Sequence, residues 1–254
     1  MNVFLTGASR GLGAALARHY ATRGATLGLL ARDGDALARL AATLAPARCS
    51  VYAADVRDSE ALRAAAADFV ERFALPDVVI ANAGISVGTL TSHARDNAVF
   101  RDVIDTNVLG MLHTFQPFVP LMLAARRGML AGIASVAGFR GLPGAAAYSA
   151  SKAAAITYLE SLRVELLDSG VAVVTVCPGY IATPMTARNP YPMPFLLSAE
   201  RAASLIAQAI ERRRRFYALP WQMACLGGLL RILPRPLYER TLARAPRKPR
   251  AEGS

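Results

Sequence analysis

Short apolar runs alternate with alanine-rich segments along the chain, and this alternation constrains the fold more than any other feature. The runs hold β-branched and aliphatic residues, and the longer segments between them have helical character. The pattern is typical of βαβ units around a parallel sheet, where each strand is buried on both faces and followed by a crossover helix. We therefore expect an α/β fold with a doubly wound parallel sheet of about seven strands and helices on both faces.

The boundaries of the expected elements follow from the same pattern. Strands are expected at Asn2–Thr6, Thr26–Ala31, Cys49–Ala53, Asp77–Ala81, Met129–Ala134 and Val171–Cys177, with a short seventh near 216–219. Helices are expected near 12–23, 34–44, 59–73, 97–125, 148–168 and 199–214. Pro117 and Pro120 lie within one expected helix and should bend or end it, because proline lacks the amide hydrogen that a helix interior needs.

The length and composition favour one large domain. The chain has 254 residues, of which 54% are apolar and 19% are charged, so it can bury a sizeable core. Residues 184–198 carry four prolines among Met, Tyr and Phe and are expected to form a shaped loop. We divide the sequence into a domain over 1–219 and a C-terminal extension over 220–254, of which residues 245–250 are expected to be a solvated, mobile end.

Most of the positive charge lies near the C-terminus. The formal net charge is +11, and residues 211–254 carry +8 of it. The nearly neutral body argues against a nucleic-acid-binding protein. The arginine run Arg212–Arg215 does not change this, because it has no accompanying binding motif and is typical of a solvated helix face. The extension has an apolar face flanked by arginines. Such a face can lie on an anionic membrane surface, or it can pack against the body or a second subunit, and the sequence leaves both open.

The sequence favours neither a disulfide framework nor a metal site. Cys49, Cys177 and Cys225 are far apart and lack C-x-x-C spacing, and the three histidines are isolated from one another. The N-terminus has no charged leader followed by an apolar run, and Pro220 and Arg231 interrupt the apolar stretch 216–233. We expect a cytoplasmic protein, with peripheral attachment to the inner membrane face as the alternative.

A glycine-rich turn follows the first expected strand. It reads Thr6-Gly7-Ala8-Ser9-Arg10-Gly11-Leu12-Gly13, with the spacing G-x-x-x-G-x-G, and it leads into a helix. Glycines let the backbone bend tightly and approach a pyrophosphate, whose charge is met by amides at the helix N-terminus. A plain structural turn is the alternative. The position after the first strand of an α/β pattern favours a dinucleotide site in a Rossmann-type fold.

Further motifs follow in order along the chain. They are Asn82-Ala83-Gly84, Asn107 within T-N-V-L-G, Ser135, Tyr148-x-x-x-Lys152 and Pro178-Gly179. With the glycine turn, they make residues 1–218 resemble the single-domain members of the short-chain dehydrogenase/reductase family. The resemblance implies an NAD(P)-dependent oxidoreductase that transfers a hydride between nicotinamide and a carbonyl or secondary alcohol. It also implies that 1–219 is the catalytic domain and that 184–198 is its substrate loop.

The expected catalytic residues are Asn107, Ser135, Tyr148 and Lys152. Tyr148 and Lys152 are four residues apart on an expected helix, so they lie on one face. A nearby ammonium favours the phenolate and should lower the tyrosine pKa, which makes Tyr148 the expected acid/base. The resemblance implies that Lys152 also binds the nicotinamide ribose and that Ser135 polarises the substrate carbonyl. It implies for Asn107 a bound water in a proton relay.

The resemblance also implies a set of cofactor contacts. These are Thr6, Gly7, Ser9, Arg10, Gly11, Leu12, Gly13, Arg32, Asp55, Val56, Asn82, Ala83, Gly84, Tyr148, Lys152, Pro178, Gly179, Ile181 and Thr183. Asp55 resembles the family's acceptor for the adenine amino group. Thr183 and the backbone of Ile181 resemble the residues that meet the nicotinamide carboxamide.

The expected cofactor is NADP(H). Arg10 and Arg32 can hold the 2′-phosphate from two sides, because a guanidinium binds phosphate through paired hydrogen bonds. NAD(H) would be preferred if Asp33 faced the ribose.

The substrate loop suggests a substrate class. Its apolar residues are Met185, Tyr191, Met193, Phe195, Leu196 and Leu197. They favour a lipophilic carbonyl compound, with a 3-oxoacyl thioester as the alternative, although packing onto the domain would explain them equally well. A cofactor-binding regulatory protein without turnover is a further alternative, and the four intact catalytic residues argue against it. The resemblance also implies a homodimer or homotetramer.

Overall fold

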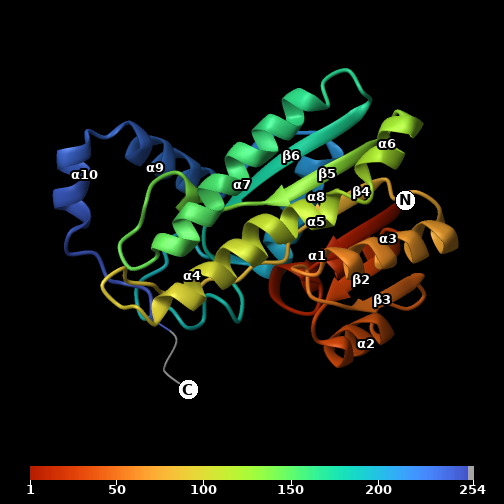
Figure 1. Cartoon of the computed structure of the whole chain (residues 1–254), viewed down its shortest axis with the longest axis horizontal. Coiled ribbons are helices and arrows are strands. Elements are labelled where there is room, and N and C mark those ends of the chain that lie inside the picture. The colour runs from red at the N-terminus through yellow and green to blue at the C-terminus, as the bar shows by residue number, and fades with distance from the viewer. Residues whose placement is uncertain (251–254) are drawn as a thin grey trace.

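Seven parallel strands form one sheet in this computed structural model, which describes residues 1–250. The order across the sheet is β3-β2-β1-β4-β5-β6-β9 (Figure 1). The strands are β1 (Asn2–Thr6), β2 (Thr26–Ala31), β3 (Cys49–Ala53), β4 (Val78–Ala81), β5 (Gly128–Ile133), β6 (Val171–Pro178) and β9 (Phe216–Leu219). In the centre of the sheet, β1 pairs with β2 and β4. The doubly wound parallel sheet predicted from the sequence is confirmed.

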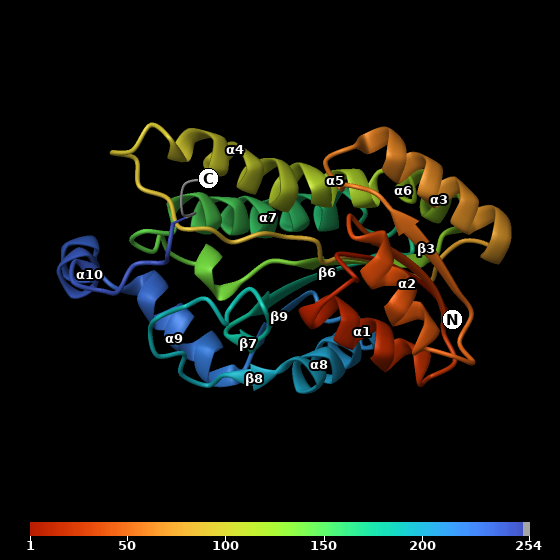
Figure 2. The ribbon, with the colours of Figure 1, turned by 90° about the horizontal axis from the view of Figure 1, so that it is seen from below.

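Helices cover both faces of the sheet, as Figure 2 shows edge-on. One face carries α1 (Gly11–Ala21), α2 (Gly34–Ala42) and α8 (Ala199–Glu211), and the other carries α3 (Ser59–Phe73), α5 (Gly110–Phe115), α6 (Val119–Ala125) and α7 (Ala146–Glu165). Successive residues of a strand point to opposite faces. In β1, Val3 and Leu5 therefore join the first hydrophobic cluster and Phe4 joins the second. Both layers of the core are built on the same strands.

The segment expected as one helix over 97–125 is divided in the structure. It begins with α4 (Asp96–Ile104), continues through a π-helical turn over Asp105–Leu109 into α5, and breaks before α6. Pro117 lies in the break, and Pro120 lies in the first turn of α6, where its missing amide hydrogen has little cost. The prolines end the helix as expected, whereas the π-helical turn was not predicted.

This same helical run, Asp96–Ala125, is apolar and long enough to pass a length and composition test for a membrane span. It is also the crossover between β4 and β5. Phe115, Phe118 and Met122 pack from it into the second hydrophobic cluster of the sheet. Packing within the fold therefore accounts for part of its apolar character, because 33% of its most apolar window is buried, while Leu109, Leu121 and Leu123 are more than 40% exposed.

The C-terminal extension folds onto the body beside the loop that precedes α7. It contains α9 (Trp221–Ile232) and α10 (Arg235–Leu242). The Arg140 guanidinium donates to the carbonyls of Leu230, Arg231 and Leu233 at the end of α9, where the last turn of a helix leaves acceptors free. It also stacks on the Tyr238 ring of α10, with its Cζ 4.1 Å from the ring centre. One arginine of the body thus fixes both helices.

Candidate functional site

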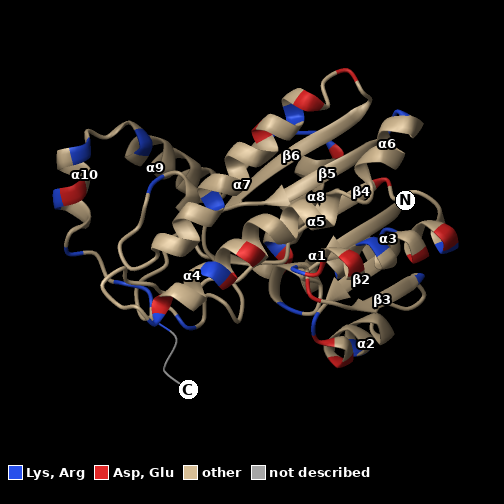
Figure 3. Ribbon diagram, viewed as in Figure 1, with Lys and Arg blue, Asp and Glu red and all other residues tan. Residues whose placement is uncertain are grey.

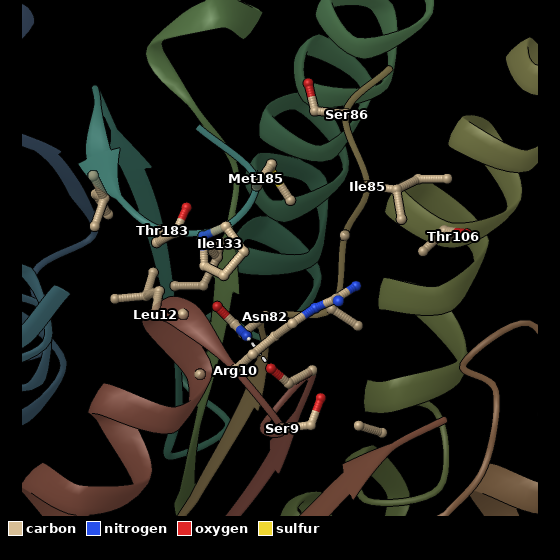
Figure 4. Close-up of a pocket in the computed structure, with 18 of the residues that line it drawn as sticks. Ser9, Arg10, Leu12, Asn82, Ile85, Ser86, Thr106, Ile133, Thr183 and Met185 are labelled. Atoms are coloured by element: carbon tan, nitrogen blue, oxygen red, sulfur yellow. Dashed lines mark hydrogen bonds between the residues drawn. The ribbon is translucent and has the colours of Figure 1, made fainter. Parts of the chain in front are cut away.

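A cavity of about 700 Å³ lies at the carboxyl ends of the central strands (Figure 4). In the sheet, β2 lies on one side of β1 and β4 lies on the other. The direction in which successive strands are added therefore reverses between β1 and β4, and the cavity lies at this position. Ligands of open α/β sheets bind in the crevice at such a point. The cavity lining comes from the turns that follow β1, β2, β3, β4, β5 and β6.

The glycine turn after β1 forms one wall of the cavity. Gly7 and Gly11 have φ angles of +66° and +56°, a backbone region that favours glycine. A Cβ on Gly13 would overlap the carbonyl oxygen of Gly7. Arg10 is the N-cap of α1 and makes no side-chain capping bond, so the first amides of the helix keep their donors for a ligand. The turn therefore fits a pyrophosphate that approaches the backbone closely.

Thr6 and Asn82 join the ends of β1 and β4 behind this wall. The Asn82 side-chain amide donates to the carbonyls of Thr6 and Gly7, at 3.1 Å in each case. The Thr6 hydroxyl accepts from the Asn82 backbone amide at 3.3 Å. Thr6 is fully buried and does not line the cavity, unlike the other expected cofactor contacts. Its place in the structure is to hold the two strand ends together.

Tyr148 and Lys152 lie one turn apart in α7, and both line the cavity. The Lys152 side chain is buried, with 4% of the residue exposed, and its Nζ donates to the Ile133 carbonyl at 2.7 Å. The same Nζ lies 5.8 Å from the centre of the Tyr148 ring. The arrangement confirms that the two side chains share one face of the helix.

The electrostatics of this pair differ from the simple expectation. Burial lowers the pKa of Lys152 to about 8. Burial also raises the pKa of Tyr148, and the Ser135 hydroxyl acts in the opposite direction. The lowering of the Tyr148 pKa predicted from its lysine neighbour is not found in this structure, where desolvation is the largest influence on that pKa.

Ser135 stands at the end of β5 and lines the cavity together with Tyr148. Its Oγ accepts from the Ala137 amide at 3.1 Å and donates to the Pro178 carbonyl at 3.3 Å. These bonds cap the short 3₁₀ turn over Val136–Gly138 and fix the hydroxyl at the edge of the sheet.

Asn107 lies in the π-helical turn and is buried behind the cavity wall. Its Oδ1 accepts from the Ile85 amide at 2.8 Å, and its Nδ2 donates to the Ile85 carbonyl at 3.0 Å and to Ser151 Oγ at 2.9 Å. A Cβ on Gly84 would lie 3.2 Å from Asn107 Oδ1 and 3.6 Å from Lys152 Nζ. Asn107 and Lys152 therefore meet beside Gly84, and a π-helical turn is often found at such functional positions.

The turns after β2 and β3 form the other end of the cavity. Asp33 Oδ1 accepts from the Ala36 amide at 2.9 Å and caps α2. Arg57 binds Asp55 through two nitrogens, and this hydrogen bonding lowers the pKa of Asp55. Arg32 Nη1 is 3.9 Å from Asp55 Oδ2, and 60% of the Arg32 side chain is exposed.

Sequence reasoning missed several residues of the lining. They are Ala31, Ala36, Ala54, Ile85, Ser86, Val87, Thr106, Ile133, Ala134, Pro184, Thr186 and Arg188. Most of them adjoin a predicted residue, so extending each motif by one or two positions would have found them. Ser86 and Val87 continue the Asn82-Ala83-Gly84 motif, and Arg188 belongs to the loop 184–198.

Comparisons with known proteins agree with this geometry. A family model described as short chain dehydrogenase matches residues 1–192. An uncharacterized oxidoreductase of Myxococcus xanthus is 40% identical over 242 residues, which cover 92% of this chain and 93% of the relative. Two solved structures are similar in fold. One is a 3-oxoacyl-[acyl-carrier protein] reductase from Brucella melitensis with bound NAD, with 31% identity, a TM-score of 0.75 and coverage of 86% and 88% of the two chains.

The other is an alcohol dehydrogenase from the archaeon Thermococcus sibiricus complexed with 5-hydroxy-NADP. It has 26% identity and a TM-score of 0.77, and the likeness covers 86% of this chain and 94% of that one. Structures similar to this chain thus hold either form of the nicotinamide cofactor.

Proposed function

The chain belongs to the short-chain dehydrogenase family and is an NAD(P)-dependent oxidoreductase, and from this premise we propose that Tyr148, Lys152, Ser135 and Asn107 form its catalytic site. The observation that carries the proposal is the meeting of Tyr148 and Lys152 on one face of α7 with Ser135 at the end of β5. The bound nicotinamide cofactor supplies or accepts the hydride.

Tyr148 exchanges the proton in this proposal. During reduction its hydroxyl donates a proton to the carbonyl oxygen, and during oxidation the phenolate accepts that proton from the alcohol. Ser135 donates a second hydrogen bond to the same oxygen, for which its hydroxyl turns its one proton away from the Pro178 carbonyl. Lys152 stabilises the phenolate through its charge, and its pKa of about 8 keeps the ammonium largely protonated at neutral pH. Asn107, beside Lys152, holds a water that returns the proton from solvent.

We further propose that the cofactor is NADP(H). Arg32 has most of its side chain exposed at the cavity edge, and Arg10 belongs to the glycine turn of the same cavity. Asp33, whose carboxylate would favour NAD(H) if it faced the ribose, uses one carboxylate oxygen to cap α2. Comparison of kcat/KM for NADPH and NADH tests this preference.

We propose a lipophilic carbonyl or secondary alcohol as the substrate. In the loop 184–198, Met185 lines the cavity, while Phe195 and Leu196 are 50% and 45% exposed. Met185 therefore gives the cavity an apolar wall, and the exposed Phe195 and Leu196 add apolar surface to the same loop, which supports a lipophilic ligand. A 3-oxoacyl thioester is the second candidate, because a reductase of that substrate class from Brucella melitensis is among the similar structures.

The assembly proposed for the protein is a homodimer or homotetramer in the cytoplasm, with 1–219 as the catalytic domain. Trp221, Leu226, Leu229, Ile232 and Leu237 are exposed on the C-terminal extension. Figure 3 shows basic residues along the same α9–α10 segment. We assign this face to attachment, either to an anionic membrane surface or to a second subunit. Co-sedimentation with anionic but not neutral vesicles would favour the membrane, and a concentration-dependent mass without vesicle binding would favour the subunit.

Turnover is the direct test of the proposed function. The protein is incubated with NADPH or NADH and a panel of ketones and aldehydes, and the absorbance of the reduced cofactor is followed. Loss of absorbance that depends on the carbonyl compound supports an oxidoreductase of this class. Tight cofactor binding without turnover of any panel member would instead support the regulatory alternative.

A further inference from the structure

The last described residues, 247–250, return from α10 to the body of the protein, and we call them the C-terminal tail. Figures 1 and 2 both show this segment close to the start of α4 and the start of α7. The Gly88 amide donates to the Pro249 carbonyl at 2.9 Å. Arg250 binds Asp96 at the start of α4, with Nη2 2.8 Å from Oδ1 and Nε 2.9 Å from Oδ2. Asp96 is 9% exposed, whereas the Arg250 side chain is 34% exposed, so the carboxylate is shielded from water and the guanidinium only in part.

A third contact fixes the other side of the tail. A Cβ on Gly144 would lie 2.7 Å from Arg247 Cβ, so the tail packs directly against the loop that precedes α7. The same loop meets the chain after β4, because the Thr89 amide donates to the Gly144 carbonyl at 3.0 Å. The tail therefore bridges the loop after β4 and the loop before α7.

This bridge brings Lys248 to the proposed catalytic tyrosine. Lys248 Nζ donates to Ser86 Oγ at 2.6 Å and lies 5.6 Å from the centre of the Tyr148 ring. That distance is nearly the same as the 5.8 Å between Lys152 Nζ and the same ring centre. Ser86 lines the cavity, and Figure 4 shows it at the opposite end from Ser9 of the glycine turn. The Lys248 ammonium does not itself line the cavity, and it contacts the substrate end through Ser86 and Tyr148.

Lys248 is not the only residue that holds the tail in place. Besides its bond to Ser86, the anchors are the Pro249 carbonyl, the Arg250 ion pair and the packing of Arg247. Within residues 1–250, no carboxylate forms an ion pair with Lys248. Burial lowers the pKa of Lys248 to about 8. A partly buried ammonium of this kind gains free energy from an anion, because the anion offsets its lost hydration.

We propose that Lys248 and Ser86 bind a carboxylate of the substrate, so that the substrate is an oxo acid, or the corresponding hydroxy acid, with a lipophilic remainder. Lys248 supplies the charge, and the Ser86 hydroxyl, which accepts from Lys248, still has its own proton to donate. The reacting carbonyl then lies beside Ser135 and Tyr148, and the loop 184–198 covers the apolar remainder. This inference rests on the proposed catalytic role of Tyr148 and narrows its substrate class.

Matched pairs of substrates test the proposal. The holoenzyme is assayed with oxo acids whose carboxylate and ketone are separated by one, two or three bonds, and with the methyl ester of each acid. We expect the best acid to exceed its ester in kcat/KM by roughly tenfold to a hundredfold, as a charged hydrogen bond commonly contributes, with most of the difference in KM. Lys248→Met should bring the acid-to-ester ratio of kcat/KM close to one, and Lys248→Arg should keep part of the preference for the acid.

Arg244→Met is the matched control. Arg244 is an exposed residue between α10 and the C-terminal tail, and its replacement removes one positive charge without touching the cavity. The acid-to-ester ratio should be unchanged in this variant. A loss of the ratio in both variants would show a general effect of net charge and would overturn the proposal.

A binding measurement keeps the inference separate from the proposed function. Calorimetric titration of a medium-chain alkanoic acid into the protein–cofactor complex needs no turnover, and it should show binding that Lys248→Met loses and Arg244→Met retains. Turnover of neutral ketones with no preference for acids in the wild-type protein would reject the oxo acid while leaving the oxidoreductase in place. Absence of all turnover, with carboxylate binding intact, would instead count against the catalytic assignment.

Discussion

The two ends of the cavity are built in different ways. The end formed by the turns after β1, β2, β3 and β4 uses chain segments that directly follow neighbouring parallel strands. The other end combines the chain after β4, the loop before α7, the loop 184–198 and the C-terminal tail. These segments are up to 162 positions apart, as in the hydrogen bond between Lys248 and Ser86. The sheet alone positions the first end, whereas contacts between loops position the second.

The largest effect is expected at Tyr148, where the two ends meet. Tyr148→Phe keeps the ring and removes only the proton donor, so turnover should fall by about 10²-fold or more while the affinity for the cofactor is retained. Steady-state kinetics and a fluorescence titration of the reduced cofactor measure the two quantities. Tyr158→Phe is the control, because Tyr158 lies on the same helix but packs against the second hydrophobic cluster. This variant should change turnover very little. Near-normal turnover of Tyr148→Phe would remove the catalytic assignment.

The next effect concerns the glycine end alone. In Gly13→Ala the new Cβ would overlap the Gly7 carbonyl oxygen, so the turn must shift away from the position that fits a pyrophosphate. We expect the dissociation constant of the cofactor to rise by roughly tenfold, the cost of about one charged hydrogen bond. Gly228→Ala, where no atom lies within 4 Å of the added Cβ, is the control. Unchanged cofactor affinity in Gly13→Ala would show that the turn does not approach the ligand closely.

A smaller and more selective effect is expected at Arg32. Arg32→Ala should lower kcat/KM for NADPH by roughly tenfold and leave the value for NADH almost unchanged, because only NADPH carries the 2′-phosphate. The ratio of the two values is the quantity to measure. An equal loss with both cofactors would indicate a structural role for Arg32. A wild-type preference for NADH would contradict the proposed cofactor.

The smallest effect is expected when the ion pair that anchors the C-terminal tail is removed, and it should appear in hydrogen exchange rather than in turnover. Asp96→Asn removes the charge that binds Arg250, so the amide of Gly88 should exchange its hydrogen faster, while the affinity for the cofactor stays the same. The wild-type pair is also pH dependent. Arg250 lowers the pKa of Asp96 to about 2, so the contact is fully present above the ordinary carboxyl pKa and is lost as the pH falls through about 2. Identical exchange at Gly88 in both proteins would show that the ion pair does not hold the tail.

The same contrast explains what the sequence predicts and what it does not. The strands β1 to β6 and the glycine turn follow from local patterns, because burial and close backbone approach leave a direct mark on residue type. The π-helical turn around Asn107 leaves no comparable mark, since its five residues, Asp105–Leu109, carry no pattern that distinguishes a π-helical turn from an α-helix. Residues 245–250 were predicted to be a solvated, mobile end, and several of them are exposed, but residues 247–250 also make specific contacts with the body that were not predicted. The proline and arginine content of the tail is typical of free ends, and its partners Gly88, Asp96 and Gly144 belong to no motif.

The position of the tail has a consequence for the growing chain. Because synthesis proceeds from the N-terminus, every turn around the glycine end has left the ribosome before α8 is made. Residues 247–250 are added after every element that lines the dinucleotide cleft, and only then can the opposite end of the cavity be completed. A polypeptide that stops short of Arg247 therefore contains the whole dinucleotide cleft and lacks Lys248. If Lys248 binds the substrate as proposed, such a truncated copy should still bind the cofactor but lose its preference for carboxylates.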